Sequence, residues 1–259
     1  MKKIDIHIHL AKDDPSMDTY IKLMDEHDVE ACLVHALMRP AGGNEAVLKA
    51  VKAHPDRLYG SVHVDLRNPV YECIDLVRQY KDEGFKCVKM FPNLGFDPND
   101  EEYEPFWQVV EELGLMCLSH CGWLAHAQDR RERRSSLTAS PFHFEIPARR
   151  HPGINFIFAH FGGGATYLET VTLLSRLPNC YADTCRGWGV WVWEQRMPGL
   201  QGLDFRHVLF GTDTIGEKYG EHEQWWRKTL LDMGRTEEEL KLYFYENNAK
   251  LLGLQQSGD

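Results

Sequence analysis

The sequence lacks any hydrophobic run of the ~18–20 residues that a membrane-spanning helix requires, and its mean hydropathy is −0.44. Positive charge is also scarce, because 29 Lys and Arg face 39 Asp and Glu and leave a net charge of −10. An acidic chain of this kind is poorly suited to bind nucleic acids or anionic membranes. The first residues, Met-Lys-Lys-Ile-Asp-Ile-His, lack the apolar stretch of a signal peptide. We therefore expect a cytoplasmic protein that binds neither nucleic acid nor membrane.

Two motifs that would point to other chemistry are missing. None of the seven cysteines forms a Cys-x-x-Cys pair, and most lie in apolar segments, so buried, reduced thiols are expected. No Gly-x-Gly-x-x-Gly fingerprint follows any apolar segment. The run Gly162–Gly164 follows one such segment but lacks the spacing of a dinucleotide site, so it is weak evidence for a phosphate ligand.

The length of 259 residues matches the ~250 residues of a (β/α)₈ barrel that forms a single domain. Eight short segments rich in β-branched and aromatic residues recur at fairly even spacing and are predicted strands. They are residues 3–10, 30–38, 58–66, 85–92, 114–122, 155–163, 180–185 and 207–214.

Helical patterns lie between the predicted strands. They cover residues 16–28, 44–54, 70–83, 103–113 and 165–177, with weaker candidates at 143–151 and 197–202 and two helices near the end, at 221–233 and 236–252. Ser16 is the expected N-cap of the first helix. Alternating strands and helices indicate parallel βαβ units. The predicted fold is an α/β TIM barrel with C-terminal helices, and residues 1–259 form its single domain.

The first predicted strand alternates polar and apolar residues. Asp5, His7 and His9 fall on one face and three isoleucines fall on the other. In a barrel the polar face is expected to point into the bore, and the two histidines lie near the carboxyl end of the strand, where barrel active sites are found. Two imidazoles at i and i+2 on one face can chelate one metal ion.

Further polar residues occupy equivalent positions in other segments. His120 and His160 end the fifth and sixth segments, and Asp213 lies near the end of the eighth. The register of a barrel directs these side chains and the two histidines of the first strand toward one volume. The pattern therefore predicts a metal centre.

Several segments together carry a resemblance to a known family. They read IDIHIHL, GFKCVKMFP, LSHCG, FAHFGG, FGTD and ENNAKLLGL. The chain resembles the amidohydrolase superfamily over nearly its whole length, in the amidohydrolase-2 branch related to aminocarboxymuconate-semialdehyde decarboxylase. These are metal-dependent TIM-barrel enzymes, and the motifs are specific for the family but not for a substrate.

The resemblance implies roles for individual residues. His7, His9, His120 and Asp213 become the expected ligands of one divalent metal ion. Three imidazoles and one carboxylate suit zinc best. Asp213 is also the expected general base and acid. His160 is expected beside the metal-bound water or the substrate, as a further ligand or as a proton donor and acceptor.

Four residues are expected to contact the substrate. Lys89 ends the fourth strand; in binuclear relatives a carboxylated lysine from this strand bridges two metals, but an unmodified lysine that holds a substrate carboxylate or a neighbouring acid is favoured here. Arg39 and Arg186 follow the second and seventh strands, and each either binds a carboxylate or forms a salt bridge at the surface of a loop. Trp188, in a tryptophan-rich stretch, is expected either at the mouth of the bore or in packing at its rim.

Other polar residues have open interpretations. His35 and His63 lie within predicted strands and are expected to be core histidines. Asp183 either supports the site or is structural. The charged loop 123–142 is either solvated or a lid.

The expected activity is metal-dependent hydrolysis of a C–O or C–N bond in a small, carboxylate-bearing substrate. The alternative is a metal-dependent, non-oxidative decarboxylation of an aromatic or unsaturated acid. The ligand set does not separate the two reactions. The expected partner is this small molecule, and a homodimer or a higher homo-oligomer stays open.

Overall fold

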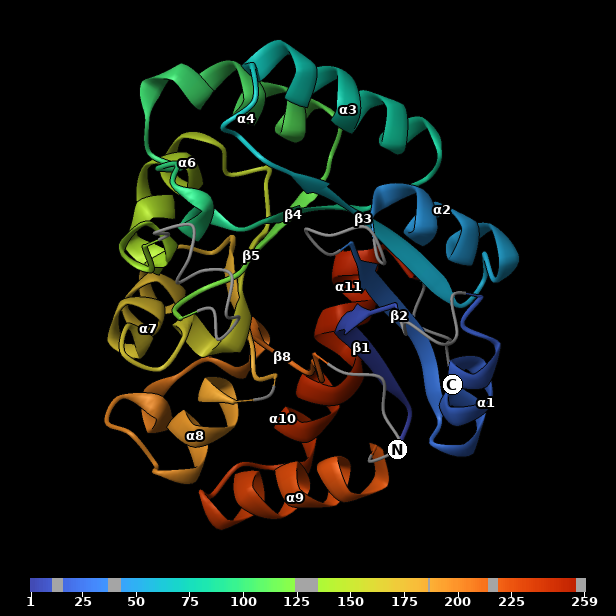
Figure 1. Ribbon diagram of the computed structural model, residues 1–259. Helices are drawn as coiled ribbons and strands as arrows, with labels where there is room; N and C mark the ends of the chain where they lie inside the picture. Colours follow the sequence, from blue (N-terminus) through green and yellow to red (C-terminus); the bar gives the residue numbers. More distant parts are fainter. Residues whose placement is uncertain (11–15, 37–42, 124–134, 186, 214–218, 255–259) are drawn as a thin grey trace.

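A computed structural model describes residues 1–10, 16–36, 43–123, 135–185, 187–213 and 219–254. Eight parallel strands follow one another around a single sheet in the order of the sequence (Figure 1). They are β1 Lys3–His9, β2 Val29–His35, β3 Leu58–Val64, β4 Cys87–Met90, β5 Met116–Ser119, β6 Phe156–Phe158, β7 Cys180–Asp183 and β8 Val208–Leu209. Backbone bonds from Ile6 N–H to Phe210 C=O (3.1 Å) and from Asp213 N–H to His7 C=O (2.7 Å) join β1 to the segment after β8. The predicted TIM barrel is therefore confirmed.

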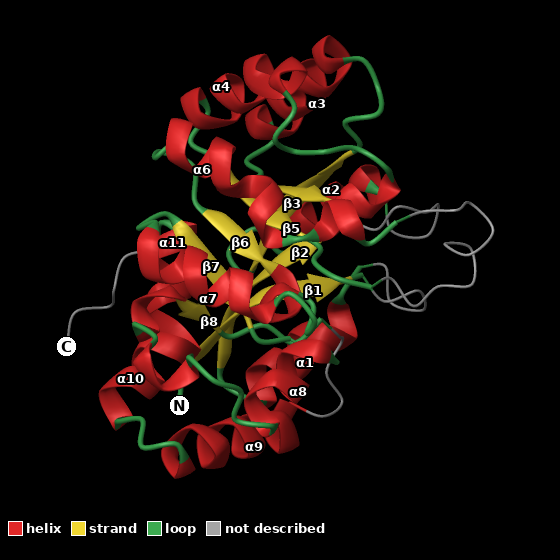
Figure 2. Cartoon of the chain, turned by 90° about the vertical axis from the view of Figure 1, so that its left-hand side faces the viewer, coloured by secondary structure: helices red, strands yellow, loops and turns green. Residues whose placement is uncertain are grey.

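Helices surround the strands on the outside, as Figure 2 shows. They are α1 Asp18–Glu26, α2 Asn44–Ala53, α3 Val70–Asp82, α4 Glu104–Glu112, α6 Glu145–Arg150, α7 Tyr167–Arg176, α8 Trp188–Glu194, α9 Tyr219–Asp232, α10 Glu237–Lys241 and α11 Asn247–Leu252. A π-helical turn, Leu242–Glu246, joins α10 to α11. Among the described residues, no helix has both the length and the apolar character needed to cross a membrane.

Several predicted element boundaries need correction. Helix α1 begins at Asp18, and its N-cap is Met17 in a left-handed conformation. Ser16 is not the N-cap, because its hydroxyl donates to the Asp18 carboxylate instead (2.8 Å). Most strands are shorter than predicted, and β8 has only two residues.

The sequence predicted no helix or strand for the tryptophan-rich stretch. It forms the helix α8, whereas the helix predicted at 197–202 is reduced to a 3₁₀ turn at Leu200–Gly202. Helix α8 is the helix that follows β7 in the alternation of a (β/α)₈ barrel. The barrel pattern of the whole chain therefore overrides the strand-like composition of this stretch.

The face assignment in β1 is wrong for Asp5 and also for Ile4 and Ile6. The pairing of β1 with β2 shifts register between Asp5 and Ile8, so the strict alternation of faces is broken there. Ile4 and Ile6 join the apolar cluster inside the barrel. Asp5 pairs with Cys32 and bonds to Tyr219 of α9, so its carboxyl group lies toward the helices.

The C-terminal helices complete the barrel at the amino ends of the strands. Asn248 of α11 donates from Nδ2 to the carbonyl oxygens of Ile4 (2.6 Å) and Phe210 (3.0 Å). It therefore bridges the gap where β8 is too short to pair along β1.

Candidate metal centre

Three of the predicted ligands converge at the carboxyl ends of the strands. His7 and His9 come from the end of β1, and Asp213 comes from the turn after β8. Asp213 Oδ1 lies 3.1 Å from His9 Nε2 and 3.4 Å from His7 Nε2. Among the described residues this trio is one of three sets whose ligand atoms all lie within 4.8 Å of one another.

The separations within this trio fit ligands that share one metal ion. Zn–N and Zn–O bonds of ~2.0–2.1 Å at tetrahedral angles place neighbouring ligand atoms about 3.3 Å apart, close to the separations of Asp213 Oδ1 from the two imidazoles. Burial lowers the pKa of His7 to about 4, with Lys89 adding to the effect, so its imidazole is neutral and able to ligate. Burial opposes ionisation of Asp213, but the imidazoles of His7, His9 and His160 hold its pKa well below its usual range.

His120 and His160 stand beside the trio and contact each other. His160 Nε2 lies 3.2 Å from His120 Nδ1, and the ring centroids of His7 and His160 are 5.7 Å apart. His120 Nε2 is buried and has no hydrogen-bond partner among the described residues. An orphaned ring nitrogen of this kind fits a ligand or substrate contact. His120 does not, however, belong to any of the three sets with ligand atoms within 4.8 Å.

Lys89 lies inside the site. Its side chain is 1% exposed, and Nζ is 3.2 Å from His7 Nε2 and 5.1 Å from the centre of the Phe91 ring. Burial lowers the pKa of the ammonium group, while Asp213 and Asp183 oppose the shift. The structure therefore places this cation beside His7, within the cluster of predicted ligands.

Two further residues of the site come from the end of β7: Asp183, whose role the sequence left open, and Cys185, to which the sequence assigned no role. Asp183 at the end of β7 bonds His7 Nδ1 through Oδ2 (2.8 Å). Cys185 Sγ lies 3.1 Å from His160 Nδ1 and 3.4 Å from His7 Nδ1. These two residues occur in the other sets of candidate ligands, His7–Asp183–Cys185 and His160–Cys185–Asp213. The sequence did contain a signal for them, because an Asp-x-Cys pattern lies at the carboxyl end of a predicted strand, where the other site residues also lie.

His35 supports the second imidazole of β1. Its carbonyl oxygen accepts from His9 Nδ1 (2.9 Å), which leaves His9 Nε2 to face Asp213. The His35 ring is buried and bonds the Ile6 carbonyl oxygen through Nε2 (2.9 Å), while its Nδ1 has no hydrogen-bond partner among the described residues. His63 is half-buried, and burial lowers its pKa to about 4.

The glycine run after β6 shapes the backbone at His160. His160 and Phe161 have φ values of 56° and 50°, and Gly162–Gly164 continue with positive φ. Left-handed backbone costs ~1–2 kcal/mol for a residue with a side chain, so the strain is concentrated at His160 and Phe161. A Cβ on Gly163 would lie 2.4 Å from the Cα of Gly122. The glycines are therefore explained by the tight turn and by the close approach of the backbone to Gly122. No phosphate ligand is needed to explain them.

The remaining predicted contacts lie at the rim or outside the described residues. Trp188 begins α8, is 44% exposed, and covers Gly164, whose added Cβ would lie 2.6 Å from Trp188 Cε3. Arg39, Arg186 and residues 124–134 of the charged loop lie outside the described residues. Trp188 is therefore the one rim residue of this group that the structure places.

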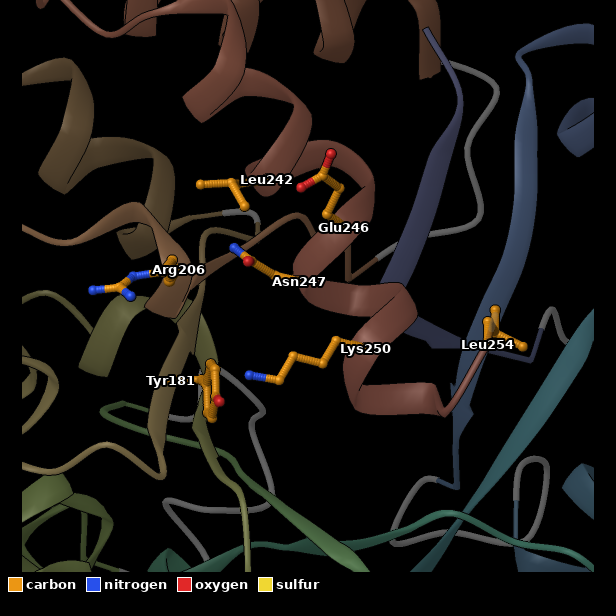
Figure 3. Close-up of a pocket in the computed structure, with 7 residues that line it drawn as sticks. All are labelled: Tyr181, Arg206, Leu242, Glu246, Asn247, Lys250 and Leu254. Carbon is orange, nitrogen blue, oxygen red and sulfur yellow. The ribbon is translucent and has the colours of Figure 1, made fainter. Parts of the chain in front are cut away.

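A separate cavity of about 320 Å³ lies at the opposite end of the barrel. Lys250 of α11 points toward Tyr181 of β7 across it, and Arg206 also lines it (Figure 3). The Arg206 guanidinium already pairs with Asp204. This cavity is therefore distinct from the histidine cluster and shares none of its residues.

Comparison with known proteins identifies the family. Three solved structures are similar to this chain at low sequence identity. Similarity at this level establishes a shared fold but not a shared activity. The 2,6-dihydroxybenzoate decarboxylase from Rhizobium is 17% identical with a TM-score of 0.69, over 98% of this chain and 99% of that one. The probable 2-pyrone-4,6-dicarboxylic acid hydrolase from Acinetobacter baumannii, with citric acid bound, is 18% identical with a TM-score of 0.61, over 98% of this chain and 100% of that one.

The third structure is an amidohydrolase from Burkholderia multivorans with bound zinc, 14% identical with a TM-score of 0.67, over 98% of this chain and 100% of that one. No curated protein sequence matches the chain. The family model described as amidohydrolase matches residues 4–254. The chain therefore belongs to the amidohydrolase family of TIM-barrel enzymes.

Proposed function

We propose that this enzyme is a metal-dependent hydrolase that cleaves a C–O or C–N bond in a small, carboxylate-bearing substrate. The convergence of His7 Nε2, His9 Nε2 and Asp213 Oδ1 at the carboxyl ends of the strands carries the proposal. In TIM barrels, this end is where catalytic groups meet.

The proposed cofactor is one divalent metal ion, with zinc favoured by the imidazole and carboxylate donors. His7, His9 and Asp213 would hold it, with His120 as a fourth ligand. When bound, the metal acts as a Lewis acid that activates water and polarises a substrate oxygen. The zinc bound in the Burkholderia amidohydrolase supports this choice of metal.

Asp213 and His160 are proposed to move protons during the reaction. The Asp213 carboxylate is 26% exposed, so it reaches the solvent side of the cluster while Oδ1 faces the two imidazoles. It takes a proton from the attacking water and returns it to the leaving group. His160 is proposed to donate or accept a proton, and its Nε2 lies 3.2 Å from Nδ1 of the proposed ligand His120.

Substrate orientation is assigned to Lys89 and the rim. The buried ammonium group of Lys89 binds a substrate carboxylate beside His7. Arg39 and Arg186 are proposed to bind a second anionic group, and Trp188 to contact an apolar part of the substrate. The citric acid bound in the Acinetobacter hydrolase supports a polycarboxylate-like substrate.

The second candidate is a metal-dependent decarboxylase of an aromatic or unsaturated acid. It is supported by the similarity to the Rhizobium decarboxylase and by Lys89, which can hold a carboxylate before CO₂ leaves. In this reaction a proton is added to the substrate carbon and the C–CO₂ bond breaks. The same residues would serve both reactions.

A substrate panel separates the two candidates. The zinc-loaded enzyme is incubated with lactones, amides and aromatic acids while acid release and CO₂ are both measured. Acid release without CO₂ is expected for the hydrolase, whereas CO₂ evolution would replace it with the decarboxylase. The His9→Ala variant serves as the control, because activity that it retains would not come from this site.

A further inference from the structure

Strand β7 supplies none of the three atoms of the trio, yet its last residue lies in the middle of the site. Asp183 is fully buried. A carboxylate withdrawn from water is stabilised only by good hydrogen-bond partners. Its contacts therefore indicate what it does.

One oxygen of Asp183 faces the ligand His7. Asp183 Oδ2 lies 2.8 Å from His7 Nδ1. A neutral imidazole carries one N–H and one lone pair, and an ionised carboxylate can only accept. The proton of His7 therefore lies on Nδ1, and the lone pair lies on Nε2, the atom that faces Asp213.

The other oxygen holds the backbone that carries His160. Asp183 Oδ1 accepts from the backbone N–H of His160 (2.9 Å) and of Cys185 (3.2 Å). His160 has a φ of 56°, a conformation that residues with side chains rarely adopt. The bond from Asp183 helps to hold this turn, which directs the His160 ring toward His120.

We propose that Asp183 is a positioning residue that couples the metal ligand His7 to the proton-transfer residue His160. Oδ2 fixes the tautomer of His7, and Oδ1 fixes the turn of His160. Both oxygens are engaged, so Asp183 does not ligate the metal itself. The part of the inference that concerns metal binding rests on the proposed function. The part that concerns the tautomer of His7 is independent of it.

The test replaces Asp183 with asparagine, which has nearly the same shape. The side-chain oxygen of the variant can still accept from His160 N–H, but its amide group now donates toward His7 Nδ1. His7 is then expected to carry its proton on Nε2, where the proton blocks metal binding. In ¹⁵N NMR of histidine-labelled, metal-free protein, the His7 proton is expected on Nδ1 in the wild type and on Nε2 in Asp183→Asn.

Metal affinity provides the second readout. Competition with a chromophoric chelator is expected to give a Zn²⁺ Kd that is ~10–100 times weaker for Asp183→Asn than for the wild type. The matched control is Cys185→Ser, which changes the other group near His7 Nδ1, 3.4 Å away, and leaves the carboxylate in place. The control is expected to keep the Nδ1 tautomer.

The outcomes separate this inference from the proposed function. A wild-type His7 that carries its proton on Nε2 overturns the inference without any variant, even if Asp183→Asn does not fold. An unchanged Zn²⁺ Kd in folded Asp183→Asn also overturns it. A wild-type protein that binds no divalent metal, or whose metal survives His9→Ala, instead refutes the proposed metal centre.

Discussion

Replacement of Asp5 tests how strand β1, which carries His7 and His9, is joined to the turn that carries Asp213. Asp5 Oδ1 accepts from the backbone N–H groups of His7 (3.0 Å) and Thr212 (3.1 Å). Oδ2 accepts from the hydroxyl groups of Thr212 (2.6 Å) and Tyr219. One carboxyl group therefore ties β1 to the turn that presents Asp213, and Asp5→Ala removes all four bonds.

The expected loss of stability follows from the donors that stay buried. The hydroxyl groups of Thr212 and Tyr219 can rotate toward other acceptors, but the two backbone N–H groups cannot. An unpaired buried donor costs ~1–3 kcal/mol, so Asp5→Ala is expected to lower the free energy of unfolding by about 2–6 kcal/mol. For a chain of this size that corresponds to roughly 5–20 °C in Tm.

Asp5→Asn is the matched variant. Its Oδ1 still accepts from both N–H groups, and its amide can donate to the two hydroxyl oxygens. Burial raises the pKa of Asp5 to about 7, against the lowering effect of its hydrogen bonds, so a neutral side chain is a close substitute. We expect Asp5→Asn to lower the free energy of unfolding by no more than about 1–2 kcal/mol, which is the net contribution of one or two ordinary hydrogen bonds.

The assay is denaturant unfolding of the metal-free proteins, which removes any contribution from ligand binding. If Asp5→Ala lowers the free energy of unfolding by less than about 1 kcal/mol, the carboxyl group does not join β1 to the turn that carries Asp213. Equal losses in both variants would show that charge, and not the acceptor for the two N–H groups, is what matters.

Four further predictions concern the site. His9→Ala is expected to reduce the metal content from about one ion per chain to none, as measured by elemental analysis of dialysed protein; unchanged content would contradict the assignment. Asp213→Asn is expected to keep the fold and part of the metal but to lower kcat by ~10²–10⁴-fold, the usual contribution of a general acid or base, and an unchanged kcat would exclude that role. Gly163→Ala is expected to destabilise the protein by at least ~1–3 kcal/mol, because a left-handed residue would also press on Gly122; a wild-type Tm would refute this. Native mass spectrometry is expected to show the unmodified mass, and a gain of one CO₂ would point to a carboxylated Lys89.

The sequence predicted the barrel and the meeting of His7, His9 and Asp213, because both depend on simple regularities. Repeated βα units define the fold. The carboxyl ends of parallel strands meet at one end of the barrel, so polar residues at those ends converge whatever the exact strand lengths. That tolerance explains why short strands such as β8 did not disturb the prediction.

The supporting residues could not be predicted in the same way. The role of Asp5 depends on a register shift in β1 that the alternating sequence does not reveal. The roles of Asp183 and Cys185 depend on which face of β7 they occupy and on the distance from β7 to β1. Helix α8 was predictable in principle, because a helix is expected after β7, but the tryptophans and valines of this stretch have low helix propensity and no helix was predicted there.

The two residues proposed to move protons share an uncommon backbone conformation. His160 and Asp213 have φ values of 56° and 53°, and each follows the end of a strand. Such a conformation persists only where its surroundings hold it. Asp183 Oδ1 accepts from His160 N–H, and the His7 carbonyl oxygen accepts from Asp213 N–H. Both turns are therefore anchored to the metal ligand His7, directly or through Asp183, so a displacement of His7 is expected to misplace both proton-transfer groups together.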